Sequence, residues 1–355
     1  MVRYIAKKFL YGLLVLTGVV MLVFFLFQGF GDPSRLVMGQ TGDSATQANI
    51  RKELYLINEK GESIPKFKQF LFYLNDVSPL CIHTKEDIKK KNLSGIFIGG
   101  EKKLGIKIPY LRKSYQTKRD VWDVLTQALP GTLMLAGAAM FIAILIGIPL
   151  GVMAAVKQNT WLDTSAIFSS IVGISAPSFF MGIIIAYLFG FVLSDWTGLH
   201  ISGSWFEIDD VTGERKLTIQ NLILPALTLG IRPLAIITQL TRSAMLDVLD
   251  QDYIRTAYAK GLSKRKVIWK HGLRNALNPV ITAVTGWFAE LLAGAFFVEY
   301  IFGWQGLGKV TVDALEKLDY PVVMGSVLIS AAFFILINIL ADILYGVVDP
   351  RVKVQ

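Results

Sequence analysis

The chain has 355 residues, 53% of them hydrophobic, and carries a formal net charge of +9 at pH 7. Its apolar residues fall in blocks long enough to cross a bilayer, which takes about 20 residues of helix, and this excludes an ordinary soluble protein. The positive charge comes without a nucleic-acid-binding motif, so basic loops beside membrane helices are the better explanation. Cys81 is the single cysteine, which excludes an internal disulfide and a thiolate metal cluster.

Six apolar blocks predict an all-α polytopic membrane protein with six transmembrane helices. A signal peptide is the alternative interpretation of the first block. That block is too long for one, and the residues at its end, Gly29-Phe30-Gly31-Asp32-Pro33, do not form a small-x-small cleavage site. We therefore expect a retained first helix whose basic start, with Lys7 and Lys8, lies in the cytoplasm. The predicted spans are residues 9–30, 131–156, 164–193, 221–241, 279–302 and 321–348.

Residues 31–127 differ from the rest of the chain because they are charged and contain no block that could span a membrane. We expect a small extracytoplasmic domain of mixed α/β fold, inserted after the first helix, with short strands at Ile96–Ile98 and Leu104–Ile108. Its lysines do not contradict the positive-inside rule, since long domains translocate largely regardless of charge. The chain is then divided into a tail and first helix (1–30), the insert (31–127) and a five-helix membrane domain (128–355).

The stretch between the fourth and fifth spans is dense in Lys and Arg, which places it on the cytoplasmic side. Its residues 244–259 are good helix formers, and Gly261 can end a helix in the left-handed conformation. Ser263 can cap a second helix that runs toward His271. The predicted loop, residues 243–275, is therefore a helix, a tight turn and a helix that face the cytoplasm. With an even number of spans, both ends of the chain are expected there as well.

Small side chains in this loop, at Ala257 and Ala259, would let another protein come close to the turn. The loop resembles the Glu-Ala-Ala…Gly loop of ABC importer permeases, in the variant of the oligopeptide and dipeptide permeases, where it forms a coupling helix that docks on the ATPase subunit. A basic loop held to anionic lipid is the simpler alternative. The resemblance implies that the coupling residues are Arg255, Thr256, Ala257, Tyr258, Ala259, Lys260, Gly261, Leu262 and Ser263.

The loop departs from the family pattern at three places. Arg255 stands where the family has Glu, Thr256 where it has the first Ala, and Leu273-Arg274 where it has Leu-Pro. These departures fit the peptide branch better than the sugar branch. Other segments resemble the same family in the same order along the chain, and they say little about the cargo. They are Gly29–Pro33, Ser175–Gly182, Leu224–Gly230 with Leu240–Met245, and Asp319–Pro321 with Asn338, Asp342, Tyr345 and Asp349–Arg351.

Residues Gly303–Val310 nearly match a phosphate-binding P-loop, G-x-x-x-x-G-K-[ST]. We reject that interpretation because Val310 replaces the magnesium-binding Ser or Thr, the preceding block is a membrane helix, and the topology puts the stretch outside. The stretch resembles instead the Pro-Gly-Leu-Gly segment of peptide permeases, with Gln305 in place of Pro. We expect a Gly-rich turn that binds no nucleotide.

Polar residues inside the predicted spans are candidates for a functional role, because burying them in lipid is costly. Asn338 and Asp342 share one face of the sixth span, where polar contacts between helices are the favoured interpretation. For Glu290 and Glu299 in the fifth span, a pathway-lining role and a structural ion pair are both open. Arg232 in the fourth span is a candidate partner.

Neither a catalytic constellation nor a metal-ligand spacing is present in the sequence, since its three histidines are dispersed and no nucleophile lies in a recognisable elbow. The resemblance implies a non-catalytic permease subunit of an ATP-driven importer for dipeptides or oligopeptides, located in the cytoplasmic (inner) membrane. It implies a homologous permease as heterodimer partner, two ATPase subunits that carry ATP and Mg, and an extracytoplasmic solute-binding protein. We expect this chain to bind no cofactor, metal or nucleic acid.

Three alternatives are open at this point. Within the family, nickel or another small solute is the alternative cargo. An ion-coupled secondary transporter would use Glu290, Glu299 and Asp342, but it predicts internal repeats with paired broken helices, which we do not find. A non-transporting membrane scaffold, with the insert as its binding domain, would leave the patterned cytoplasmic loop unexplained.

Overall fold

The computed structural model describes residues 2–29, 48, 51–52, 54–58, 60–204, 206–208 and 215–348. The family-like segment at the end of the first helix lies outside these residues from position 30 onward. The chain divides into two compact units. Unit 1 comprises Met1–Phe9, Ala128–Lys309 and Ala332–Gln355, and unit 2 comprises Leu10–Gln127 and Val310–Ala331.

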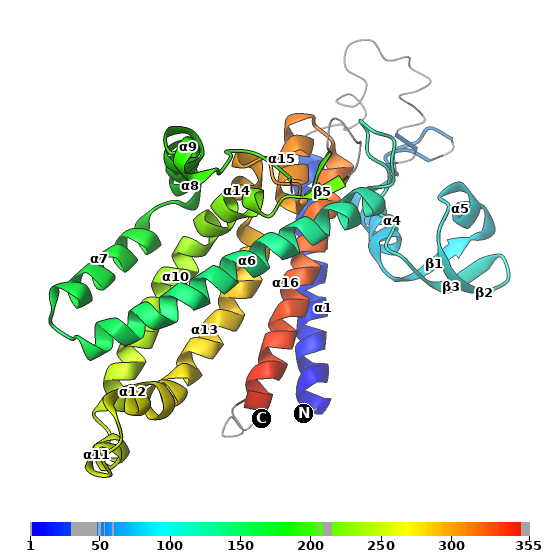
Figure 1. Ribbon diagram of the computed structural model, residues 1–355. Coiled ribbons are helices and arrows are strands. Elements are labelled where there is room, and N and C mark those ends of the chain that lie inside the picture. The colour runs from blue at the N-terminus through cyan, green and yellow to red at the C-terminus, as the bar shows by residue number, and fades with distance from the viewer. Residues whose placement is uncertain are drawn as a thin grey trace. The chain divides into compact units, whose positions relative to one another are not determined.

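Four helices among the described residues are long and apolar enough to cross a membrane (Figure 1). A fifth span results if the bent pair Trp161–Ser175 and Ser178–Val192, which turns by 110°, crosses as one. The chain is therefore a mostly helical membrane protein with four or five candidate spans, where the sequence pattern predicts six. The four long helices are α1 (Val2–Gly29), α6 (Val121–Val156), α10 (Gln220–Leu249) and α16 (Tyr320–Val348).

The predicted third span is broken near its middle by a proline. Pro177 has no N–H and favours an extended residue before it, so Ala176 leaves the helix with φ −74° and ψ 130°. α7 (Trp161–Ser175) ends at this break, and α8 (Ser178–Tyr187) begins beyond it. α8 continues into a π-helical turn at Leu188–Val192. The break provides a bend in what the hydropathy alone reads as one helix.

The predicted fifth span, residues 279–302, is not among the candidate spans of the described part of the chain. Its helix α13 (Leu273–Gly294) begins earlier and carries polar side chains, such as Glu290, that lower its apolar character. The helix is interrupted at Ala295, and the short α14 (Phe296–Ile301) follows. These residues therefore do not form a single continuous span.

α6 begins at Val121, ten residues before the predicted start of the second span, and contains both Pro130 and Pro149 within its 36 residues. A proline inside a helix removes one backbone hydrogen bond, which membrane helices tolerate when neighbouring groups take its place. The predicted start of the second span at Gly131 is therefore too late, because the helix already begins at Val121. The border between the two units falls inside this helix, between Gln127 and Ala128.

The helices α1 and α16 run antiparallel, side by side (Figure 1). Near the start of α1, Lys8 Nζ lies 2.8 Å from Asp342 Oδ2 near the end of α16. At the other end of α1, the ring centroids of Phe27 and Tyr320 are 5.3 Å apart. The start of α1 and the end of α16 therefore lie together.

The core of unit 1 includes residues of α6, α10 and α13, and the backbones of α6 and α10 approach closely at small residues. A Cβ on Gly151 of α6 would lie 2.6 Å from the Thr238 carbonyl oxygen of α10. A Cβ on Gly230 of α10 would lie 2.8 Å from the Ala139 carbonyl oxygen of α6. Such close contacts are typical of helices that pack within a membrane. Buried apolar side chains fill the remaining space, among them Leu135, Ile237 and Val280.

The short elements of unit 1 lie at its two ends (Figure 1). α11 (Asp252–Ala259) and α12 (Lys264–Lys266) lie at one end, and α9 (Ser194–Thr197) lies at the opposite end. Between α9 and α10, the strands β4 (Phe206–Ile208) and β5 (Arg215–Leu217) pair antiparallel.

The insert forms a small α/β fold in unit 2, as the sequence predicts. The strands β1 (Leu80–Thr84), β3 (Lys102–Lys107) and β2 (Gly95–Gly99) form an antiparallel sheet in that order. β2 and β3 confirm the two predicted strands, while β1 is an addition that the sequence pattern does not indicate. The helices of the insert are α4 (Lys66–Val77) and α5 (Lys85–Lys90), and Thr84 caps α5 by accepting the N–H of Asp87 at 3.1 Å.

One face of this sheet is apolar and exposed. Because side chains alternate along each strand, two rows of apolar residues lie on the same face. The first row is Leu80, Ile106 and Ile96, the second is Ile82, Leu104 and Ile98, and each of the six is between 56% and 77% exposed. A patch of this kind is typical of a surface that another molecule covers.

Candidate functional site

The predicted cytoplasmic loop contains two helical pieces and a tight turn, but its first helix is shorter than expected. α10 runs on to Leu249, and the chain turns at Asp250–Gln251 before α11 begins at Asp252. Gln251 is extended, with φ −75° and ψ 147°, and separates the two helices. The helix predicted over residues 244–259 is therefore two helices.

Gly261 closes α11 in the left-handed conformation, with φ +73°. Its N–H donates to the Tyr258 carbonyl at 2.9 Å, and the N–H of Leu262 donates to the Ala257 carbonyl at 3.3 Å. Together these bonds form a Schellman motif, which a residue with a Cβ adopts only with strain. The turn after α11 thus depends on glycine.

Ala257 lies inside the loop and not on its surface. Its side chain is 7% exposed and packs with Ile254 and Val267, next to Leu262. This cluster holds α11 against the π-helical turn Val267–Gly272, which connects α12 to α13. We therefore correct the expectation that another protein approaches Ala257, because the side chain is already covered by its own chain.

The outer surface of the loop is formed by the residues between these contacts. Tyr258 is 43% exposed, and the small side chain of Ala259 is exposed beside it. The surface thus combines an aromatic ring, small residues and positive charge. Of the nine predicted coupling residues, Ala257 is buried, Leu262 is half-buried, and the exposed ones are Arg255, Thr256, Tyr258, Ala259, Lys260, Gly261 and Ser263.

A nearly buried ion pair ties this end of unit 1 together. Arg242 donates through Nη2 to Asp163 Oδ2 at 2.8 Å and through Nε to Asp163 Oδ1. Asp163 also accepts the N–H of Asn159 at 3.0 Å. The pair joins the first turn of α7 to the last third of α10, so the start of α7 lies at the same end of unit 1 as the predicted cytoplasmic loop. Sequence reasoning missed this pair because its members are 79 positions apart and no local pattern connects them.

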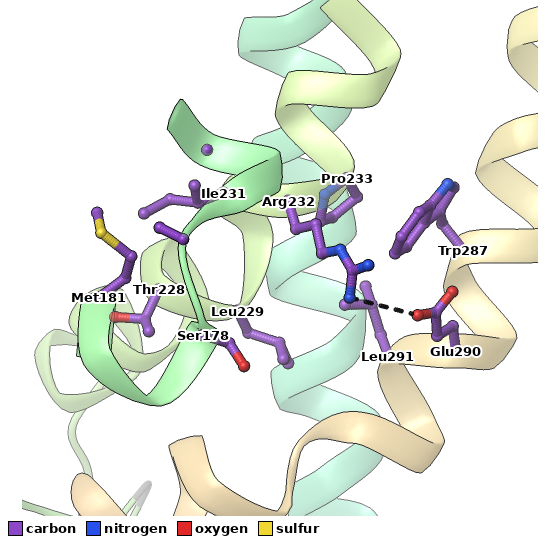
Figure 2. Close-up of a pocket in the computed structure, with 12 residues that line it drawn as sticks. Ser178, Met181, Thr228, Leu229, Ile231, Arg232, Pro233, Trp287, Glu290 and Leu291 are labelled. Atoms are coloured by element: carbon purple, nitrogen blue, oxygen red, sulfur yellow. Dashed lines mark ion pairs between the residues drawn. The ribbon is translucent and has the colours of Figure 1, made fainter. Parts of the chain in front are cut away.

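A cleft lies at the break between α7 and α8, with α10 and α13 as its other walls (Figure 2). Its lining is mostly apolar and includes the hydroxyl groups of Ser178 and Thr228 and one pair of opposite charges. The residues that line it are Gly173, Ala176, Ser178, Met181, Thr228, Leu229, Ile231, Arg232, Pro233, Trp287, Glu290 and Leu291.

The charged pair in the cleft is Arg232 and Glu290. Arg232 Nη1 lies 3.8 Å from Glu290 Oε1, and the guanidinium carbon lies 5.2 Å from the centre of the Trp287 ring. Figure 2 shows Arg232 extending from α10 toward Glu290 on α13, with Trp287 on the same helix. At 3.8 Å the ion pair is longer than a hydrogen bond. The structure thus brings together two of the five polar residues that the sequence singles out.

Glu299 lies apart from this cleft and is fully buried. One carboxylate oxygen accepts the Thr132 hydroxyl at 2.7 Å, and the other accepts the N–H of Gly308 at 2.6 Å and of Lys309 at 3.2 Å. The Thr132 hydroxyl in turn accepts the N–H of Leu307, the first residue of α15 (Leu307–Glu316), at 2.8 Å. This geometry favours a structural role for Glu299 over a pathway-lining one.

The remaining predicted polar residues lie on α16. Asp342 forms the ion pair with Lys8 described above, and Asn338 donates to the Phe334 carbonyl of its own helix at 2.8 Å. The side chain of Tyr345 and the whole of Asp349 lie outside the described residues. For Asp342, the contact is one between helices, as the sequence analysis favours.

Comparison with known proteins gives a consistent result. Residues 147–354 match the family described as "Binding-protein-dependent transport system inner membrane component". The dipeptide transport system permease protein DppB of Haemophilus influenzae is 43% identical over 254 residues, which cover 68% of this chain and 76% of that protein. The protein of the same name in Escherichia coli is 35% identical over 375 residues, 99% of each chain. The di/tripeptide transport system permease protein DppB of Pseudomonas aeruginosa is 35% identical over 374 residues, 100% of each.

Proposed function

Because the chain belongs to the family of binding-protein-dependent transport system inner membrane components, we propose that it forms half of the membrane pathway of an ATP-driven importer of dipeptides and oligopeptides. The observation that supports peptides as the cargo is the 35% identity to a dipeptide permease along 99% of both chains. The chain itself is a non-catalytic permease subunit. ATP and Mg are bound by partner ATPase subunits.

The family assignment favours an ATP-driven permease over the two alternatives from other protein classes, the ion-coupled secondary transporter and the membrane scaffold. A binding-protein-dependent system takes its energy from ATP and not from an ion gradient, so the ion-coupled secondary transporter and the scaffold are no longer needed. Nickel is the alternative cargo within the family. The relatives named above support peptides, and nickel becomes an outcome of the transport experiment.

Coupling to ATP hydrolysis is assigned to the outer face of α11 and its turn. Tyr258 and Ala259 lie on this face, and the basic residues around Lys260 add positive charge. An ATPase surface with complementary acidic groups would dock here, while the cluster of Ile254, Ala257 and Val267 transmits its movement to α13. Movement of this rigid element by the ATPases would then rearrange the long helices.

The importer needs further partners. The four or five candidate spans of the described residues are few for a closed pathway, so a second, homologous permease completes it, and a heterodimer is the expected form. The family name implies a solute-binding protein, which delivers the cargo on the extracytoplasmic side. The insert, with its exposed apolar sheet face, is assigned to the same side.

Orientation follows from the clustering of basic residues in the loop around α11. We expect both ends of the chain and this loop in the cytoplasm, and the insert outside. Single cysteines at the exposed positions Ser263 and Ser94, in a Cys81→Ser chain, test this. An impermeant maleimide should label Ser94→Cys only from outside in intact cells and Ser263→Cys only after the membrane is opened. Labelling of both from the same side would contradict the orientation.

The transport experiment uses the complete complex in proteoliposomes, with its second permease, ATPases and solute-binding protein. We expect ATP-dependent uptake of a labelled dipeptide that stops when the binding protein is omitted. Nickel uptake is measured in parallel. ATP-driven accumulation of nickel without uptake of any peptide would replace the proposed cargo.

A further inference from the structure

Two charged side chains of unit 1, Arg232 near the middle of α10 and Glu290 in the last turn but one of α13, are joined only loosely. Arg232 is 12 residues from the start of α10, or about 18 Å of helix. Its distance of 3.8 Å from Glu290 leaves each side chain 53% exposed. The Asp163–Arg242 pair is the opposite case, because two hydrogen bonds join side chains that are only 4% and 21% exposed. The loose pair is open to a further ligand, whereas the tight pair is not.

Lipid does not account for the exposure of Arg232 and Glu290. A charge in the hydrocarbon layer is costly, so charged side chains of membrane helices face a water-filled cavity, a ligand or a partner. Both residues line the cleft between α8, α10 and α13 (Figure 2). Trp287, 5.2 Å from the guanidinium, adds an aromatic wall that stabilises a cation through its ring face.

A hydroxyl group adds to the polar lining of the cleft. The break at Pro177 opens the opposite wall, where Ser178 contributes a hydroxyl group. The cleft thus combines one cation, one anion, a hydroxyl group and apolar surface.

This combination matches a peptide with free termini. Such a peptide carries a carboxylate at one end, an ammonium at the other and a variable, often apolar, middle. We infer that Arg232 and Glu290 form a transit site for the two termini of the peptide cargo, an inference that rests on the function proposed above. Arg232 binds the carboxylate through two parallel hydrogen bonds, and Glu290 binds the ammonium. The 3.8 Å ion pair opens as the termini replace its two partners.

A bare divalent cation fits the same cleft less well. Its single carboxylate, Glu290, lies beside the fixed positive charge of Arg232, which repels a metal ion. A zwitterion instead satisfies both charges at once and leaves neither unpaired. The charge balance of the cleft therefore favours a peptide over nickel.

The test uses the complete complex in proteoliposomes and compares Arg232→Gln, Glu290→Gln and the double variant. Each single change should lower ATP-driven dipeptide uptake roughly ten- to a hundred-fold, because a charge-assisted bond to one terminus is lost. The double variant should be at least as impaired as the worse single one. The amount of second permease and ATPase that copurifies should not change. Asp342→Asn is the matched control, since Asp342 and Lys8 form an ion pair of similar exposure outside the cleft, and its uptake should equal the wild type.

Three results would overturn the site. A purely structural pair predicts that the double variant recovers relative to the singles, since no unpaired charge is left behind. A contact between permeases predicts that the variants lose the second permease on purification. If uptake is unchanged in all three variants, the proposed transit site is refuted, but the proposed function is not affected. Failure of the wild-type complex to take up any peptide refutes the proposed function itself, and with it the site.

Discussion

The Glu299 carboxylate accepts a hydrogen bond from the backbone N–H of Gly308 at 2.6 Å, so an acidic side chain of α14 fills the Gly-rich turn that follows it. The N–H of Lys309 donates to the same oxygen. P-loops likewise surround an anion with backbone N–H groups. Here the anion belongs to the chain itself. A Cβ on Gly306 would lie 2.4 Å from the carboxylate, which shows how tightly the turn encloses it.

Glu299→Gln should destabilise the permease. The amide oxygen of Gln replaces one acceptor, but its NH₂ group then faces an N–H donor or the Thr132 hydroxyl, which leaves a buried donor without a partner. We expect a loss of about 1–3 kcal/mol in the free energy of unfolding, seen as a lower Tm of the solubilised complex. Glu101→Gln, on the exposed surface of the insert, is the control and should leave Tm unchanged. An equal Tm for Glu299→Gln and wild type would contradict the structural role.

The contrast between Glu299 and Glu290 marks how far the sequence predicts this site. Both are acids in one apolar block, and sequence alone leaves a structural and a pathway role open for each. The two acids differ in their tertiary contacts. Glu299 accepts a hydrogen bond from Thr132, which lies on a helix 167 positions earlier in the chain. Among the described ion pairs, Glu290 contacts only the loosely placed Arg232. Burial and hydrogen bonding depend on which helices pack together, and no local pattern in one block contains that information.

The fold shows the same division between local and long-range information. Gly261 and the strands of the insert were predictable, because a left-handed turn and alternation of side chains are local properties. The bend at Ala176–Pro177 could be anticipated as a kink, but its angle of 110° depends on packing against α10. The burial of Ala257 was not predicted because an alanine fits equally well at a close contact with another protein and in a packed core.

Gly261→Val should uncouple transport from ATP hydrolysis. The residue has φ +73°, where a β-branched side chain carries about 1–3 kcal/mol of local strain, although no atom blocks the added Cβ. The Schellman turn would shift and move the outer face of α11, while the membrane helices remain inserted. We expect lower ATP-driven uptake with little change in the amount of protein in the membrane. Lys264→Gln, exposed in the same loop, should retain uptake, and full uptake by Gly261→Val would show that this turn geometry is not required.

The insert should loosen at mildly acidic pH because of His83. This side chain is 4% exposed, and burial, with Lys91 nearby, lowers its pKa below the ordinary 6.5. The unfolded insert therefore binds a proton at higher pH than the folded one. Stability is fully present above about pH 6.5 and declines as the pH falls below it. Stability falls with falling pH because the buried histidine stays neutral in the folded insert but becomes protonated when the insert unfolds.

Cys81 reports this loosening, because it is the single cysteine and is 2% exposed on the neighbouring part of β1. Its maleimide labelling rate, divided by that of a cysteine-containing peptide at the same pH, should rise between about pH 7.5 and about pH 5.5. His83→Gln cannot become charged and should flatten this dependence. A wild-type ratio that is constant over this range would refute the role of His83.

Cysteines introduced at Ala259 and Ala257 should differ in how strongly they crosslink to the ATPase subunit, and this difference tests the assigned docking face. The two alanines are two positions apart on α11, yet Ala259 is exposed and Ala257 is covered by Ile254 and Val267. In a Cys81→Ser chain, Ala259→Cys carrying a photoactivatable maleimide should crosslink to the ATPase in the assembled complex. Ala257→Cys should react slowly with the reagent and give little crosslinking.

The Ala257 position also serves as the stability control for this comparison. A larger side chain there enters a packed cluster, so Ala257→Leu should lower uptake by displacing α11, whereas Ala259→Leu should act only if the ATPase lies against it. Wild-type uptake by Ala259→Leu, together with absent crosslinking from Ala259→Cys, would mean that the outer face of α11 is not in contact with the ATPase. Crosslinking from Ala257→Cys alone would mean that α11 turns its other side to the partner, and the cluster around Ile254 would then have to open in the complex.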